Sequence, residues 1–198
     1  MAPHLLEEWY NLEDALLVGG FLNTLLRESN RVRLACLAQL VNVIAPLVTN
    51  ESAVLRQSIY YPYAWALKYA RGRVLDLLVE SETYPINAEG LRADFAINAE
   101  VPYLDVVATI NPPDGKACVL MLNRDLESER ELVLEWRDPM PARVLVCETL
   151  TGSDLKAVNT FAQPKLVAPQ PLDAPEVGSR MTFKLPPRSY SAVQFATT

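Results

Sequence analysis

The pattern of apolar residues changes near residue 73 of this 198-residue chain, and the change limits the folds that the chain can adopt. Before it, apolar residues recur at intervals of three and four, as in helices, on both sides of one long apolar run. After it, short apolar runs alternate with turn-forming residues, as in antiparallel strands. We therefore expect an α/β part over residues 1–72 and an all-β part over residues 73–198.

The first expected helix begins at Asn11, whose side chain can cap it while Asp14 completes a capping box. The apolar residues at helical spacing are Leu12, Ala15, Leu16, Phe21, Leu22, Leu25 and Leu26. The pattern predicts that the helix ends near residues 29–30. Gly19 and Gly20 lie inside it, where glycine is unfavourable, so we expect another part of the chain to pack closely there.

An almost unbroken apolar run from Val32 to Val41 follows this helix. Such a run is typical of a strand buried on both faces, as in a parallel sheet covered by helices, and not of a sheet with one wet face. A second helix is expected over residues 61–70, with Pro62 in its first turn and Gly72 after its end. The strand and the second helix make one βα unit, preceded by a helix. A closed (β/α)8 barrel takes eight such units and about 250 residues, so one unit cannot close.

The part of the chain after residue 73 contains short strand candidates and no convincing helix. Turn signals such as those at residues 112–115 and 186–187 separate them. The candidates span residues 74–79, 103–110, 117–122, 131–136, 142–147, 180–185 and 190–195. This arrangement predicts an antiparallel β sandwich or jelly roll.

Composition excludes several classes of partner. The formal net charge is -6 and the 18 Lys and Arg residues are scattered, so we expect no nucleic-acid partner. No apolar run reaches the length of a membrane span, and no secretory signal is visible at the start, so we expect no membrane association and a cytoplasmic location.

The cysteines and the histidine predict no metal site. Cys36, Cys118 and Cys147 each lie in an apolar run, which is typical of buried thiols in a reducing cytosol. His4 is the single histidine, and there is no Cys-x-x-Cys pair, so a structural zinc site is not expected.

Gln39 and Asn42 are the polar groups at the end of the expected buried strand and in its exit loop. In a (β/α) barrel the C-terminal ends of the strands hold the active site, and an amide can donate to and accept from sugar hydroxyls. Alternatively, these amides satisfy backbone groups of the loop. The residues by themselves leave both interpretations open.

Other candidate residues have structural interpretations that we favour. The carboxylates Glu7, Glu8, Glu13 and Asp14 could supply the pair that glycoside hydrolysis requires. They lie before and in the first turn of an amphipathic helix, however, where acidic residues interact favourably with the helix dipole and face water. Aromatic residues at positions 60, 61, 63, 65 and 69 could stack on sugars, but packing of the helix is the favoured role. Residues 123–125 (Asn-Arg-Asp) are interpreted as a turn with a local ion pair.

Five stretches of the chain together carry a family resemblance, at residues 5–16, 35–46, 56–62, 101–105 and 123–125. They resemble the α-L-arabinofuranosidases of glycoside hydrolase family 51, and the Leu-Ala-Gln-Leu-Val-Asn block at residues 37–42 is specific. The resemblance implies a (β/α)8 barrel followed by a jelly-roll β domain. Residues 1–72 would then be the C-terminal segment of the barrel and residues 73–198 the jelly roll.

The resemblance also implies which site residues are present. Such enzymes release terminal α-L-arabinofuranosyl groups with retention, using one glutamate as acid/base and another as nucleophile, and no cofactor. Both glutamates lie upstream of the matching segment, and Glu7 and Glu8 fall beyond the Asp-Glu-Trp-Asn context of the nucleophile. No catalytic residue is therefore expected in this chain, whereas Gln39 matches a substrate-binding glutamine of the family.

The leading hypothesis is the C-terminal part of an α-L-arabinofuranosidase, inactive without its N-terminal portion. Its expected partners are that portion, an arabinose-containing oligosaccharide or polysaccharide, and further copies in a homo-oligomer. The alternative is a non-catalytic carbohydrate-binding or assembly β domain.

Overall fold

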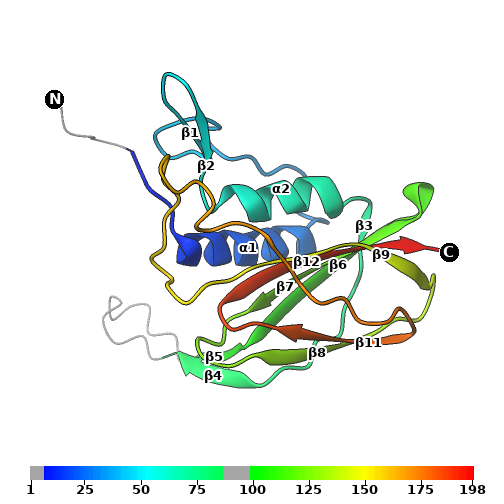
Figure 1. Ribbon diagram of the computed structural model, residues 1–198. Helices are drawn as coiled ribbons and strands as arrows, with labels where there is room; N and C mark the ends of the chain where they lie inside the picture. Colours follow the sequence, from blue (N-terminus) through cyan, green and yellow to red (C-terminus); the bar gives the residue numbers. More distant parts are fainter. Residues whose placement is uncertain (1–6, 87–98) are drawn as a thin grey trace.

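The computed structural model describes residues 7–86 and 99–198, and within them it contains two helices and twelve strands (Figure 1). The helices are α1 (Leu12–Arg27) and α2 (Tyr60–Tyr69), and a 3₁₀ turn, η2 (Pro112–Asp114), joins two strands. The strands are β1 (Leu47–Thr49), β2 (Val54–Arg56), β3 (Arg73–Val74), β4 (Thr83–Ile86), β5 (Ala99–Pro102), β6 (Leu104–Asn111), β7 (Lys116–Asn123), β8 (Arg130–Glu135), β9 (Pro141–Leu150), β10 (Gln170–Pro171), β11 (Arg180–Leu185) and β12 (Ser189–Thr197). None of the described helices has the length and apolar character needed to cross a membrane.

An antiparallel six-stranded sheet in the order β10-β9-β12-β7-β6-β3 forms the middle layer. β12 lies between β7 and β9, where Val193 is opposite Val119 on one side and Cys147 on the other. The β6–β7 connection turns through η2 and Gly115, whose φ of 58° is in the left-handed region that glycine adopts without strain. Smaller two-stranded sheets pair β8 with β11, β4 with β5 and β1 with β2.

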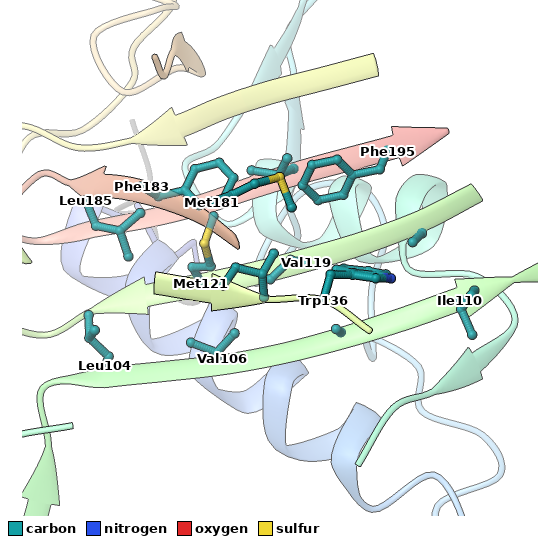
Figure 2. Close-up of a cluster of buried hydrophobic side chains, with 14 residues drawn as sticks. Leu104, Val106, Ile110, Val119, Met121, Trp136, Met181, Phe183, Leu185 and Phe195 are labelled. Atoms are coloured by element: carbon teal, nitrogen blue, oxygen red, sulfur yellow. The ribbon is translucent and has the colours of Figure 1, made fainter. Parts of the chain in front are cut away.

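Both faces of the six-stranded sheet are covered. Helices α1 and α2 lie on one face, and the β8–β11 pair lies on the other (Figure 1). The alternation along β6 follows from this: Val106 packs towards β8 and β11 with Phe183 (Figure 2), whereas the adjacent Val107 packs towards the helices with Trp65. Two buried clusters therefore form, and the central strands are apolar on both sides, as covering of both faces requires.

The mostly β character of the second part is confirmed. Strands β6, β7, β8, β9, β11 and β12 lie where apolar runs predict them. The predicted strand over residues 74–79 is largely wrong. Only Arg73 and Val74 pair with β6, Leu75 donates one further hydrogen bond to the Ala108 carbonyl at 2.8 Å, and Leu78 is exposed.

The predicted strand from Val32 to Val41 is wrong for the chain that the structure describes. Residues 33–40 adopt no regular secondary structure, and Leu34 and Leu40 are 82 % and 65 % exposed. A strand buried on both faces requires a neighbouring strand and a covering layer. Both faces of the large sheet are already covered, so the run has neither a neighbouring strand nor a covering layer in the described chain.

The cysteines differ between prediction and structure for the same reason. Cys118 is buried as expected and Cys147 is partly buried, and burial raises the pKa of Cys147 to about 11. Cys36 is exposed because it belongs to the run that lacks a sheet, so the prediction of a buried thiol is wrong there. His4 lies outside the described residues.

The predicted capping box of α1 is confirmed. The Asn11 side chain accepts a hydrogen bond from the Asp14 amide at 3.0 Å, and the Asp14 carboxylate accepts one from the Asn11 amide at 2.8 Å. The close approach expected at the helix glycines occurs at Gly19, where an added Cβ would lie 2.6 Å from Cδ2 of the buried Tyr190. Glycine at this position lets α1 lie against the sheet.

Replacing Gly19 by alanine is expected to lower the free energy of unfolding by about 1–3 kcal/mol, because the new methyl overlaps the Tyr190 ring. Gly20 is the matched control: its Cβ would meet only a flexible methyl group of Leu122 at 3.3 Å. Gly20→Ala should be neutral or gain up to about 1 kcal/mol from helix propensity. Urea denaturation of both variants measures the difference, and equal stabilities would contradict the close packing at Gly19.

Candidate functional site

Residues 32–44, which we call the exposed segment, connect α1 to the β1–β2 hairpin. At one end the Val32 amide donates to the Glu28 carbonyl at 2.8 Å, in the turn that ends α1. At the other end the Asn42 amide donates to Leu47, and the Val43 carbonyl accepts from Glu8, at 2.7 and 2.8 Å. The segment is therefore held at both ends, and its apolar middle faces solvent.

Gln39, the predicted substrate-binding residue, lies in the middle of the exposed segment. Its side chain is exposed and has no hydrogen bond to any other residue within 7–86 or 99–198. Its amide is consequently available to a ligand and braces no loop in this structure. Its role in binding substrate stays a prediction.

The bracing role belongs to two other amides. Asn42 accepts a hydrogen bond from the Thr49 amide at 2.7 Å and donates to the Thr49 hydroxyl at 3.0 Å, which fits the structural interpretation of this residue. Gln57 is buried, donates to the carbonyls of Glu8 and Ala45, and accepts from the Tyr10 amide. The sequence patterns did not single out Gln57, because its partners lie in two segments distant from it along the chain, residues 8–10 and the loop at Ala45.

The N-terminal carboxylates have the structural roles expected for the start of a helix. Asp14 belongs to the capping box, and Glu13 forms an exposed ion pair with Lys156. Glu7 and Glu8 are exposed and precede α1. None of these four carboxylates lies in an enclosed site of the described chain. A catalytic acid needs such a site, because burial raises the pKa of its carboxyl group.

The aromatic residues of α2 mainly pack against the sheet, as favoured. Tyr61, Trp65 and Tyr69 are buried in the cluster between the helices and the sheet. The Trp65 ring stacks on Tyr190 with a centroid separation of 6.1 Å, and its Nε1 donates to Glu148 at 3.0 Å. These three rings are not available to stack on sugars.

The turn expected after β7 is confirmed, but its ion pairs reach further than expected. The Asp125 carboxylate accepts from the amides of Glu127 and Ser128, both at 2.9 Å, and lies 2.7 Å from Arg130. Arg124 instead reaches back to Asp105, with Nη2 2.6 Å from Oδ2. The turn thus connects to the start of β6.

Asp105 is the centre of a buried polar cluster between α1 and the sheet, and sequence patterns did not reveal it. Arg27, the last residue of α1, contacts both carboxylate oxygens, at 2.6 and 3.2 Å. Asn23, one turn earlier, donates to Oδ1 at 3.1 Å and accepts from the Tyr190 hydroxyl at 3.0 Å. With Arg124, three side chains contact one carboxylate, two from α1 and one from the loop after β7.

The charge of Asp105 is stabilised by these partners. Burial by itself would raise the pKa of the carboxyl group. The hydrogen bond and charge of Arg27, the charge of Arg124 and the hydrogen bond from Asn23 outweigh burial and hold the pKa of Asp105 below its ordinary value. The carboxylate is therefore ionised at neutral pH.

A family model described as the alpha-L-arabinofuranosidase C-terminal domain matches residues 1–189. The chain belongs to this family. Curated relatives of this alpha-L-arabinofuranosidase C-terminal domain include the intracellular exo-alpha-(1->5)-L-arabinofuranosidase of Streptomyces lividans, 36% identical over 197 residues. The exo-alpha-(1->6)-L-arabinofuranosidase of Bifidobacterium longum is 34% identical over 200 residues. The matches cover 98% of this chain but only 28% and 36% of those two proteins.

Solved structures give the same result. A family 51 alpha-L-arabinofuranosidase from Bifidobacterium longum superposes with a TM-score of 0.86 at 34% identity, covering 98% of this chain and 36% of that one. The arabinose complex of the Thermotoga maritima alpha-L-arabinofuranosidase has a TM-score of 0.79 at 26% identity, covering 98% and 40%. The resemblance to the C-terminal part of family 51 enzymes is confirmed.

Proposed function

We propose that this chain is the C-terminal part of a retaining exo-acting α-L-arabinofuranosidase that releases terminal α-L-arabinofuranosyl groups from oligosaccharides or polysaccharides. Residues 1–72 form the C-terminal segment of its (β/α)8 barrel, and residues 73–198 form its jelly-roll domain. Both catalytic glutamates lie in an N-terminal portion, and Gln39 of this chain contacts the sugar. Relatives of nearly equal identity are named for 1->5 and 1->6 linkages, so we propose the released group and no particular linkage.

The exposed segment is the observation that carries this proposal. It is apolar from Leu34 to Ala38, lies between two helices, and has no strand partner along residues 33–40 in the chain that the structure describes. An apolar stretch of this kind requires cover, and a barrel strand with neighbours on both sides supplies it. Gln39 follows the apolar residues directly and would then lie at the mouth of the barrel.

The alternative, a carbohydrate-binding or assembly domain that acts alone, does not account for the exposed segment. Such a module has no use for an apolar strand that its own sheets do not pair. We propose a homo-oligomeric enzyme, and a cytoplasmic location in line with relatives that are named intracellular.

The isolated chain is expected not to hydrolyse an aryl α-L-arabinofuranoside, because the N-terminal carboxylates cap a helix or face water. Together with the proposed N-terminal portion, which completes the enzyme, it should restore turnover. Release of the aryl alcohol measures both. Turnover by the isolated chain that disappears in Glu7→Gln or Glu8→Gln would contradict the assignment, as would an inactive complete enzyme that is folded.

In the complete enzyme, Gln39→Ala is expected to lower kcat/KM by roughly ten- to a hundredfold, equivalent to about 1–3 kcal/mol of lost hydrogen bonding in the transition state. Its thermal stability should stay close to that of the unchanged enzyme, since Gln39 braces nothing. Asn42→Ala is the matched control: it removes the bonds to Thr49, so it should lower stability and leave the kinetics of the folded fraction unchanged. A stable Gln39→Ala variant with full kcat/KM would remove Gln39 from the site.

A further inference from the structure

The end of α1 is attached to the sheet through one carboxylate. Asn23 and Arg27 are four residues apart and therefore on one face of the helix, and both donate to Asp105 on β6. Asn23 also donates to the Asp105 carbonyl at 3.3 Å and is itself held by Tyr190 of β12. The last turn of α1 is thus tied to two central strands.

Arg27 also lies directly before the turn that leads into the exposed segment. It is the last residue of α1, and the turn that follows is closed by the Arg31 and Val32 amides on the Glu28 carbonyl, both at 2.8 Å. From Arg33 to Leu40 no backbone hydrogen bond joins the segment to another described residue. The turn after α1 therefore holds the first end of the segment, as the bonds of Asn42 and Val43 hold the other.

Arg124 makes an equally short contact with the same carboxylate but lies elsewhere. Its Nη2 is 2.6 Å from Asp105 Oδ2, as Arg27 Nη1 is from Oδ1. It follows β7 and has no direct connection to the exposed segment. Two arginines of the chain therefore contact Asp105, and only Arg27 lies at the end of α1.

We propose that Asp105 and Arg27 are positioning residues for Gln39: the two-oxygen contact between them fixes the end of α1 and, through it, the exposed segment. The inference rests on the proposed function only for its effect on catalysis. Its structural half concerns this chain alone.

The structural half is tested with a spin label on Cys36, which lies within the exposed segment and is the exposed thiol among the cysteines. Arg27→Gln should make the label measurably more mobile at neutral pH, whereas Arg124→Gln should leave its spectrum unchanged. Arg27→Lys keeps the charge but not the two-oxygen contact, and should lie between the two. Identical spectra for Arg27→Gln and Arg124→Gln, with both proteins folded by circular dichroism, would overturn the proposal.

The catalytic half is tested in the complete enzyme. Arg27→Gln should lower kcat/KM of the folded fraction by about tenfold or more, since small misplacements of a binding group reduce rates strongly. Arg124→Gln, which loses a comparable contact, should stay within about twofold. An unchanged kcat/KM in Arg27→Gln while Gln39→Ala is impaired would overturn the positioning role and leave the proposed function standing. If Gln39→Ala were also unimpaired, the proposed role of Gln39 would fail, and the label would still decide whether Arg27 orders the segment.

Discussion

Replacing Asp105 by alanine is expected to lower the free energy of unfolding by about 3 kcal/mol at neutral pH. The change leaves Arg27, Arg124 and Asn23 facing an uncharged gap between α1 and the sheet. Both arginines stay partly exposed to water, so we expect a loss of stability near the lower end of the range for a fully buried ion pair.

Glu135→Ala is the matched control for this loss. Glu135 pairs with Arg180 at 3.2 Å, but both side chains are about 70 % exposed, so its removal should change stability by less than about 1 kcal/mol. Guanidinium chloride denaturation at pH 7 measures both variants. An Asp105→Ala loss no larger than that of Glu135→Ala would contradict the role assigned to the cluster.

The same variant should show a distinct pH dependence. The pKa of Asp105 is lowered in the folded chain. The contribution of its charge to the free energy of unfolding is therefore complete above the unfolded-state pKa of about 3.9, and it is lost as pH falls through the lower folded-state pKa. The stability difference between the unchanged chain and Asp105→Ala should therefore be constant from pH 7 to about pH 5 and shrink below about pH 4. A difference that grows on acidification would mean that the pKa is raised instead.

Phe183→Ala is expected to lower the free energy of unfolding by about 3–5 kcal/mol. The Phe183 side chain is buried between β11 and the six-stranded sheet, in the cluster that Figure 2 shows. Its loss leaves a cavity that Met181 and Leu185, on the same face of β11, cannot fill without moving the strand.

Thr182→Ala is the control on the same strand, because Thr182 points to the exposed face of β11. It should change stability by less than about 0.5 kcal/mol. Thermal and chemical denaturation compare the two. A loss below about 1 kcal/mol for Phe183→Ala would mean that the β8–β11 pair is not part of the cooperatively folded unit.

Local features of this fold could be predicted because their causes lie a few residues apart. Asn11 and Asp14 define the start of α1 through a reciprocal pair of hydrogen bonds three residues apart. Gly19, an unfavourable residue inside a helix, indicated a close neighbour correctly, although nothing in the pattern identified that neighbour as Tyr190. Six of the seven strand-like runs of the second part became strands because each has partners within this chain, whereas the run over residues 74–79 pairs only at its start.

The run from Val32 to Val41 shows where such patterns stop. An unbroken apolar run indicates that a strand needs cover on both faces, and β6 and β7 have that cover from the helices and from β8 and β11. The run at Val32 has the same pattern but no cover within the described chain, and it stays exposed. An apolar pattern indicates the cover that a segment requires, but it does not indicate whether the chain supplies that cover.

The sequence by itself determined the two helices, six of the twelve described strands and the resemblance that identifies Gln39 as a candidate sugar-binding residue. Only the tertiary structure decided that α1 and α2 cover the sheet and that Gln57 joins residues 8–10 to the loop at Ala45. It also decided that Arg27, Asn23 and Arg124 meet at Asp105. The partners of Asp105 lie 19 to 82 residues away along the chain. Periodicity and capping reflect interactions within a few residues, whereas such contacts exist only once the strands have paired and the helices have packed on them.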